Sequence, residues 1–94
     1  MLLLAVLAEG AAHGYAVIEL LRARSDGLFD LPEGTIYPAL HRLERQGLLR
    51  SAWQEHGARR RRVYHLTPDG RKALAGRRQE WRQFARAIDA TLGA

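Results

Sequence analysis

Two stretches of the sequence constrain the fold more than any other part of the chain. The first, GTIYPALHRLERQGLLRSAW (Gly34–Trp53), spaces its apolar residues for one face of a helix and then runs into a strand. The second, RRRRVYHLTPDG (Arg59–Gly70), returns as a strand through four arginines and then starts a new helix. A helix beside a basic β-hairpin fits duplex DNA, because the helix fills the major groove while the hairpin reaches phosphates.

The composition is that of one small domain. The 94 residues are 47% hydrophobic and include no cysteine, which excludes disulfides, thiol catalysis and thiolate metal sites and fits a cytoplasmic protein. A chain of this length buries a modest core, which association often supplements. The apolar run Met1–Ala8 is far shorter than the ~20 residues that span a bilayer. It is interpreted as a buried helix, and no membrane partner is expected.

The positive charge is concentrated in the second half of the chain. Residues 1–47 carry four basic and six acidic residues, a net −2, whereas residues 48–94 carry eleven and four, a net +7, which together give +5. Fourteen of the fifteen basic residues are arginine. Arginine binds phosphate and guanine edges in a bidentate way that lysine does not. The second half is therefore where we expect contact with nucleic acid.

The hydrophobic pattern predicts four helices and one hairpin. The helices are expected at residues 1–9, His13–Arg24, Glu33–Gln46 and from Pro68 onward with Thr67 as cap, and the strands at Leu48–Glu55 and Arg61–Thr67. Residues 56–60 form the tip of the hairpin, and Leu28, Phe29 and Leu31 of an intervening loop are expected to point inward. The predicted fold class is mostly α with a small β-hairpin: a winged helix-turn-helix with a long C-terminal dimerisation helix. Residues 1–67 are expected to form the DNA-binding domain and residues 68–94 the dimerisation helix.

Projection of the third helix separates an apolar stripe from an open face. The stripe consists of Ile36, Ala39, Leu40 and Leu43. The open face and its flanks provide the candidate DNA contacts, with Thr35, Tyr37, Pro38, His41 and Arg42 near the bases and Arg45 closer to the backbone. The alternative is an ordinary solvated helix face.

The four arginines of the hairpin are candidates for phosphate contact. Arg59 and Arg60 are expected at the tip, and strand alternation turns Arg61 outward. The same alternation places Arg62 beside Tyr64, so its stem is expected to pack inward. The site therefore includes Arg59, Arg60 and Arg61, with a solvated arginine run as the alternative.

The last helix carries a heptad-like apolar seam. Leu74, Trp81 and Ile88 are seven residues apart, and Phe84 and Leu92 lie on the same side. These residues are the candidate dimer interface. Trp81 is also a candidate for stacking against a flat or cationic small molecule.

Catalytic and metal-binding patterns are absent from the sequence. Its four histidines have no short metal-ligand spacing, and there is no G-x-S-x-G motif, P-loop or paired-carboxylate arrangement. We therefore expect no metal, no cofactor and no enzymatic activity. His13 and Tyr15, at the start of the second helix, are interpreted as packing and capping residues, with phosphate contact as the alternative.

The chain resembles the PadR family of transcription regulators. The resemblance rests on HGY (His13–Tyr15), Gly27–Leu49, Trp53, Arg59–Leu74 and Trp81, in that order over nearly the whole chain. It implies a winged-helix homodimer that binds a pseudo-palindromic operator, usually as a repressor, with Gly34–Arg45 as recognition helix and Gly57–Arg61 as wing.

The resemblance also implies how two copies meet. In the family the last helix forms the dimer contact together with the first helix, which adds Leu3 to the candidate interface, and in some members an aromatic or cationic effector binds there and releases DNA. Family members usually carry more residues ahead of the LLLAVL stretch, so the resemblance implies either a shortened first helix or a start site assigned late.

Two other functions fit the same pattern. One is a winged-helix protein-interaction module without operator specificity, whose arginines meet an acidic partner. The other is an RNA-binding protein, although the usual exposed aromatic stacking platform is missing. Competition among random duplex DNA, an acidic polypeptide and single-stranded nucleic acid separates the three.

Overall fold

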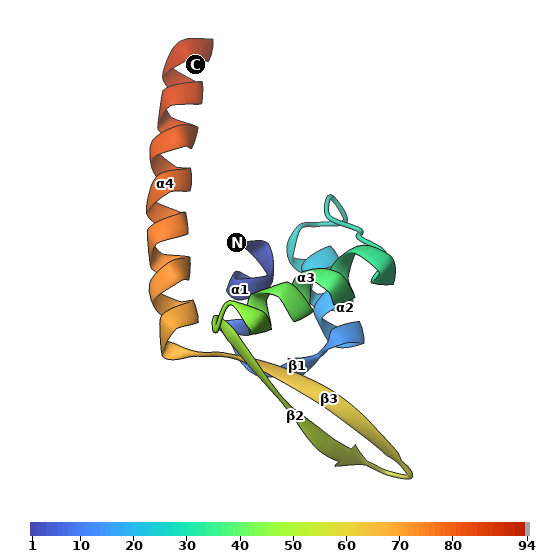
Figure 1. The fold of residues 1–94 in the computed structure, drawn as a ribbon. Coiled ribbons are helices and arrows are strands. Elements are labelled where there is room, and N and C mark those ends of the chain that lie inside the picture. The colour runs from blue at the N-terminus through green and yellow to red at the C-terminus, as the bar shows by residue number, and fades with distance from the viewer. Residues whose placement is uncertain (94) are drawn as a thin grey trace.

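A short sheet and four helices make up the part of the chain that the computed structural model describes, residues 1–93 (Figure 1). In chain order the elements are α1 (Leu2–Leu7), β1 (Ala12–His13), α2 (Gly14–Arg24), α3 (Glu33–Arg45), β2 (Leu49–His56), β3 (Arg59–Leu66) and α4 (Pro68–Leu92). The expected fold class is confirmed, and α2 and α3 begin and end within one residue of their predicted bounds. The first helix is shorter than the predicted residues 1–9.

The sheet has three strands rather than the predicted two. Its order is β1-β3-β2, and both pairings are antiparallel. Strand β1 is only two residues long and pairs Ala12 with Tyr64 and His13 with Val63. Two residues are too few to show an alternating pattern, so this strand, which exists only through its pairing with β3, could not be predicted from the sequence. This strand fixes the start of α2 against the hairpin.

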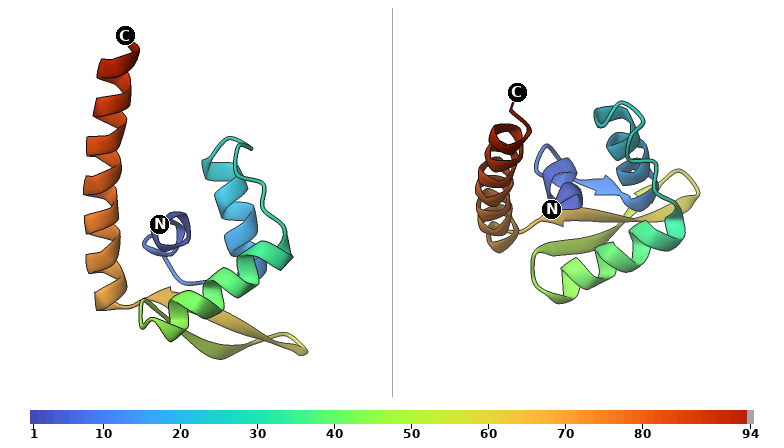
Figure 2. Two further views of the ribbon diagram at one scale, coloured as in Figure 1. Left: turned by 45° about the horizontal axis from the view of Figure 1, so that its top comes forward. Right: turned by 90° about the horizontal axis from the view of Figure 1, so that it is seen from above.

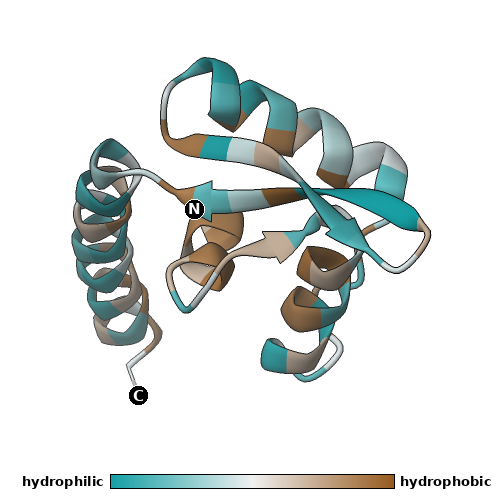
Figure 3. Ribbon diagram, turned by 90° about the horizontal axis from the view of Figure 1, so that it is seen from below, coloured by the Kyte–Doolittle hydropathy of each residue, from teal (hydrophilic) through white to brown (hydrophobic). Residues whose placement is uncertain are grey.

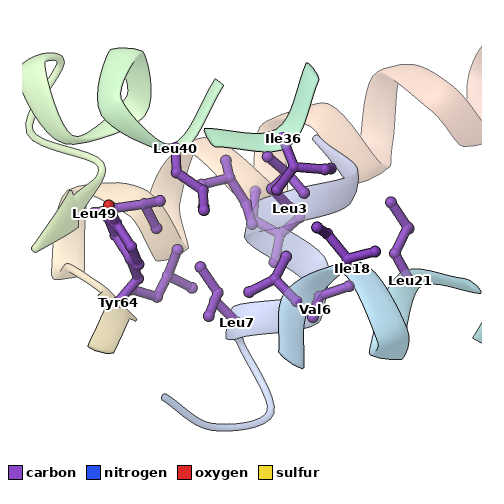
Figure 4. Packing of buried hydrophobic residues seen from close by; sticks show 13 residues of the cluster. Leu3, Val6, Leu7, Ile18, Leu21, Ile36, Leu40, Leu49 and Tyr64 are labelled. Atoms are coloured by element: carbon purple, nitrogen blue, oxygen red, sulfur yellow. The ribbon is translucent and has the colours of Figure 1, made fainter. Parts of the chain in front are cut away.

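The core gathers around α1, with every other helix contributing to it (Figure 4). Helix α1 is far too short to be stable alone, yet four of its six residues are buried, so packing stabilises it. The buried hydrophobic side chains are Leu3, Leu4, Val6, Leu7, Val17, Ile18, Leu21, Ile36, Leu40, Leu49, Tyr64, Leu66 and Leu74. Ile36 and Leu40 confirm the predicted inner stripe of α3.

Of the three apolar residues in the loop between α2 and α3, only Leu31 packs against the core as predicted. Leu28 is 78% exposed and Phe29 36% exposed, while Leu31 is half-buried. The chain turns outward at Asp26 and Gly27, which both have positive φ. Polar bonds then hold the loop: the Arg22 guanidinium lies 2.9 Å from an Asp30 carboxylate oxygen. Turn geometry and these bonds decide the loop conformation, and apolar content alone does not predict it.

The junction between the hairpin and α4 is closely packed. The Thr67 hydroxyl accepts from the Gly70 N–H (3.0 Å), which confirms it as the cap of α4, and donates to the Gly47 carbonyl (2.7 Å). Gly70 is buried, and a Cβ at this position would overlap the carbonyl oxygen of Leu48 and lie 2.7 Å from Leu66 Cδ1. The direction in which α4 leaves the domain is therefore fixed by a glycine.

Helix α4 makes the molecule elongated. Its dimensions are 56 × 28 × 21 Å, and its radius of gyration is 15.1 Å, against about 12 Å expected for a compact domain of this length. The C-terminal half of α4 extends beyond the other elements in Figure 1 and in the left view of Figure 2. Ala94, the end of the predicted dimerisation segment, lies outside the described residues. Within residues 1–93, no helix is both long and apolar enough to cross a bilayer.

Candidate nucleic-acid interface

Helix α3 exposes most of the residues predicted to contact DNA. Ile36 and Leu40 anchor its inner side in the core, which turns the opposite side outward. Pro38 lies in the second turn, where its ring replaces an N–H that would pair with a carbonyl one turn earlier. The exposed residues of this face are Gly34, Thr35, Pro38, His41, Arg42 and Arg45. They form one open surface on the helix.

Tyr37 is half-buried and lies on the side of α3 that meets α2. Its ring covers Gly14, where an added Cβ would lie 2.7 Å from Tyr37 Cζ and 2.8 Å from its hydroxyl oxygen. This packing explains the small residue between His13 and Tyr15. The half-buried Tyr37 is therefore only partly available to a ligand.

The arginine hairpin projects beside α3 as a polar ribbon (Figure 3). Its strands pair from Leu49 with Leu66 out to His56 with Arg59, and the tip is only Gly57 and Ala58. Gly57 has φ +62, which favours glycine in so tight a turn. Arg59 and Arg60 therefore lie in β3 rather than at the predicted five-residue tip. Both remain exposed.

Trp53 forms a platform for two of the arginines. It lies opposite Arg62 in the hairpin and is 57% exposed. The guanidinium carbons of Arg60 and Arg62 lie 5.1 and 5.5 Å from the centre of its ring. Such cation–π contacts order charged side chains before a ligand binds. In the sequence, Trp53 was singled out only as part of the family resemblance. Its position opposite Arg62 becomes known only once the register of the two strands is known.

Arg61 does not point freely outward as predicted. It is half-buried, and its Nη1 lies 3.0 Å from His13 Nε2. His13 caps α2, and its Nδ1 accepts from the Ala16 N–H at 3.3 Å. The predicted capping role of His13 is thus confirmed. The alternation of side chains along β3 could not predict the contact between Arg61 and His13. The contact depends on β1, which pairs with β3 and places the start of α2 beside it.

A cationic cleft of about 350 Å³ lies where these elements meet. One wall is the start of α2, whose first turn contains no acidic residue, and the other is β3. The lining residues are His13, Gly14, Tyr15, Tyr37, Arg60, Arg61 and Arg62. Arg60 and Arg61, the tyrosine hydroxyls and the positive end of a helix suit an anion such as phosphate. Tyr15, interpreted from sequence as a packing residue, is 54% exposed at this cleft.

The candidate dimer residues divide into two groups. Leu3 and Leu74 are only 8% and 2% exposed, because they pack inside the protomer core, so a second copy reaches little of either. The others remain exposed on α4: Trp81 54%, Phe84 55%, Ile88 43% and Leu92 75%. They lie on the same face of α4 as the buried Leu74, farther toward the C-terminus. The apolar face of α4 therefore extends well beyond the part that the protomer covers.

An apolar hollow of about 490 Å³ lies between α1 and α4. Trp81 forms part of its wall, with Leu2, Ala5 and Phe29 opposite and Arg78 and Arg82 also lining it. The rings of Trp81 and Phe84 are 5.6 Å apart. No group of three potential metal ligands occurs in residues 1–93.

A helical domain with one open polar helix face and a basic β-hairpin beside it is a winged helix-turn-helix. The family model of the "Transcriptional regulator PadR-like family" matches residues 3–76. The chain belongs to this family, whose members are transcriptional regulators rather than enzymes.

Individual relatives agree with this assignment. The chain is 38% identical over 81 residues to the transcriptional regulator Rv3488 of Mycobacterium tuberculosis, which covers 86% of this chain and 73% of that protein. It is also similar to the solved structure of a transcriptional regulator from Clostridium thermocellum, with a TM-score of 0.86 and 33% identity over 94% of this chain and 86% of that chain. Bacillus subtilis PadR, solved in complex with operator DNA, matches with a TM-score of 0.73 over 80% of this chain and 42% of that chain. Its 22% identity shows a shared fold alone.

Proposed function

We propose that this regulator binds duplex DNA in a sequence-specific way and represses transcription from its operator. The observation that carries the proposal is the placement of the basic hairpin beside the open face of α3. The face of Thr35, Pro38, His41 and Arg42 offers groups that read base edges in the major groove. Arg59 and Arg60 are exposed in the outer hairpin, where they are available to the phosphates that flank a groove-bound helix. The operator complex of Bacillus subtilis PadR supports the same use of this fold.

We infer that phosphate contacts come from two places. The outer hairpin offers Arg59 and Arg60, and the cleft at the start of α2 offers Arg61, Tyr15 and Tyr37. Each phosphate that the dimer neutralises makes the slope of log affinity against log salt concentration more negative by about 0.9. Three such contacts in each of two copies give a slope of roughly −5.

The proposal includes a homodimer joined through α4. Trp81, Phe84, Ile88 and Leu92 form an exposed apolar face on a helix that extends away from its own domain. A second copy that packs against this face covers it and presents two α3 helices to successive major grooves, about 34 Å apart. The operator is then pseudo-palindromic.

The same account assigns the hollow beside Trp81 to a small-molecule effector. Arg78 and Arg82 line this hollow, and none of the residues that line it is acidic, so an aromatic anion suits it better than a cation. Occupation of the hollow moves α4 relative to α1 and alters the spacing of the two α3 helices. Loss of operator binding on adding such a compound is the expected result.

Selection from a random duplex pool tests the function. The account predicts enrichment of a pseudo-palindromic site, and binding to that site that exceeds binding to a scrambled duplex. No enrichment, with equal competition by an acidic polypeptide, favours an interaction module instead. Preferential competition by single-stranded RNA favours an RNA-binding protein.

A further inference from the structure

Three polar residues join the end of α3 to the base of the hairpin. The Glu44 carboxylate, in the last turn of α3, accepts from the Ser51 N–H at 3.1 Å and from the Ser51 hydroxyl at 2.6 Å. The same hydroxyl accepts from the Arg62 Nε–H at 2.8 Å, and Arg62 Nη2 lies 3.9 Å from the other Glu44 oxygen. One residue from each of α3, β2 and β3 thus takes part. We refer to Glu44, Ser51 and Arg62 as the joint.

The joint lies at the outer limit of the hairpin's attachment to α3. Closer to the body, Leu49, Tyr64 and Leu66 are buried in the core. Beyond Ser51, every residue of β2 is exposed. The projecting part of the hairpin therefore depends on the joint on one side, and on the contact of Arg61 with His13 on the other, for its angle to the domain.

The joint also occupies the guanidinium of Arg62. Its Nε–H donates to the Ser51 hydroxyl, one Nη faces Glu44, and its guanidinium carbon lies over the Trp53 ring. The Glu44 side chain is 28% exposed and that of Arg62 46%, so screening by solvent is partial. A charged hydrogen-bonded pair in this setting holds Arg62 in place while leaving Arg59 and Arg60 exposed at the outer hairpin.

We propose that Glu44 and Ser51 are positioning residues for DNA recognition, which fix the hairpin at one angle to α3 and withhold Arg62 from phosphate. The inference rests on the proposed function, because it concerns how that function distinguishes sequences. A hairpin at a fixed angle lets only one register satisfy both base and phosphate contacts. A free hairpin with an additional mobile arginine binds any duplex, since phosphate contacts carry no sequence information.

The test compares variants on the selected duplex and on a scrambled duplex of equal length. Ser51→Ala removes the hydroxyl that joins Glu44 to Arg62, and Glu44→Gln removes the carboxylate charge that faces Arg62. Both variants are expected to bind the scrambled duplex more tightly, with a salt slope steeper by about one unit per freed arginine. The ratio of the two affinities is expected to fall roughly five-fold, the equivalent of one lost hydrogen bond.

Two control variants separate positioning from simple charge and folding effects. Glu33→Gln also removes a carboxylate from α3, but from its exposed first turn, so it reports the general effect of charge. Ser51→Thr keeps the hydroxyl and is expected to restore discrimination. If the joint is merely structural, Ser51→Ala and Glu44→Gln lower the affinity for both duplexes and the melting temperature, and they leave the salt slope unchanged. That result overturns the proposal. Equal behaviour of Glu44→Gln and Glu33→Gln overturns it as well.

A measurement without DNA separates this proposal from the proposed function. In the free protein, the Arg62 Nε–H signal in NMR is expected to be protected in the wild type and in Ser51→Thr and exposed to exchange in Ser51→Ala. A protected signal with normal discrimination by Ser51→Ala overturns the positioning role alone. Failure of the wild type to bind any duplex overturns both.

Discussion

Arg61 in the hairpin and His13 at the start of α2 meet at 3.0 Å, between Nη1 and Nε2. The other ring nitrogen of His13 faces the Ala16 N–H. A neutral imidazole accepts at one nitrogen at a time, and a protonated one accepts at neither. Both neighbours are donors, so protonation of His13 opposes both contacts. A neutral His13 therefore accepts from only one of the two donors, and protonation removes that hydrogen bond as well.

This arrangement predicts that the protein loses stability in mild acid. Burial of the ring, and then the charge of Arg61, lower the pKa of His13 below its usual 6.5. Glu19 opposes the shift and His56 adds to it. Because the folded pKa is below the unfolded one, the stabilisation is present above pH 6.5 and is lost as pH falls through the folded pKa.

Urea unfolding at several pH values checks this prediction. His13→Asn keeps a side chain that caps helices but does not titrate. The variant is expected to lose less stability than the wild type between about pH 7 and pH 5. Equal losses in the two proteins would show that His13 is not the group responsible.

Replacement of a hairpin arginine is expected to weaken binding to every duplex. Arg60→Ala removes an exposed guanidinium that Trp53 holds over its ring. The expected result is lower affinity for selected and scrambled DNA alike and a salt slope flatter by about one unit per lost contact. The control Arg86→Ala removes the same charge from the distal half of α4. A gel-shift titration of Arg60→Ala that matches the wild type at two salt concentrations would contradict the assignment of the hairpin.

Replacements on α3 are expected to separate base contact from backbone contact. Arg42→Ala is expected to relax the preference at one position of the selected site by about 1–3 kcal/mol, because arginine reads guanine edges in a bidentate way. Arg45→Ala, farther from the start of the helix, is expected to weaken all sites alike. Repeating the selection with each variant checks this. If Arg42→Ala leaves the selected consensus unchanged, Arg42 does not contact the bases.

The residues that the sequence predicted best are those whose environment is local. The inner stripe of α3, the cap at Thr67 and the open face of α3 all follow from periodicity or from a short capping pattern. They required no knowledge of distant segments. The exposures of Ile36, Leu40 and His41 agree with that reading.

The parts that the sequence did not predict depend on segments that meet across the fold. Strand β1 exists through its pairing with β3, and it brings His13 to Arg61. The contact of Glu44 with Ser51 depends on where α3 ends relative to β2. Leu74 fits the seam equally well whether its neighbours belong to the same copy or to another. Only the three-dimensional structure assigns it to the protomer core.

Two glycines of α4 are expected to respond to alanine in opposite directions. A Cβ at Gly70 would overlap the Leu48 carbonyl, whereas nothing lies within 4 Å of a Cβ at Gly76. Gly70→Ala is expected to cost about 1–3 kcal/mol of unfolding free energy through overpacking. Gly76→Ala is expected to stabilise the protein by up to about 1 kcal/mol through helix propensity. Urea titrations at one fixed protein concentration check both, and equal responses would contradict the packing of the junction.

A charge on the exposed face of α4 is expected to separate the two copies. Ile88→Asp places a carboxylate among Trp81, Phe84 and Leu92, where burial against a partner is costly. Gln83→Asp adds the same charge on the opposite side of the helix and serves as the control. Sedimentation equilibrium is expected to give a dimer for the wild type and the control and a monomer for Ile88→Asp. A wild-type monomer at every concentration would rule out the dimer.

Hydroxyl-radical footprinting on the duplex selected by the wild type shows whether two α3 helices bind DNA together. Two protected backbone segments are expected, related by two-fold symmetry, with their centres about one helical turn (~34 Å) apart. The same pattern in the DNA upstream of the chain's own gene would identify a natural operator. A single protected segment, or no protection on any duplex at low salt, would contradict DNA binding by a symmetric dimer.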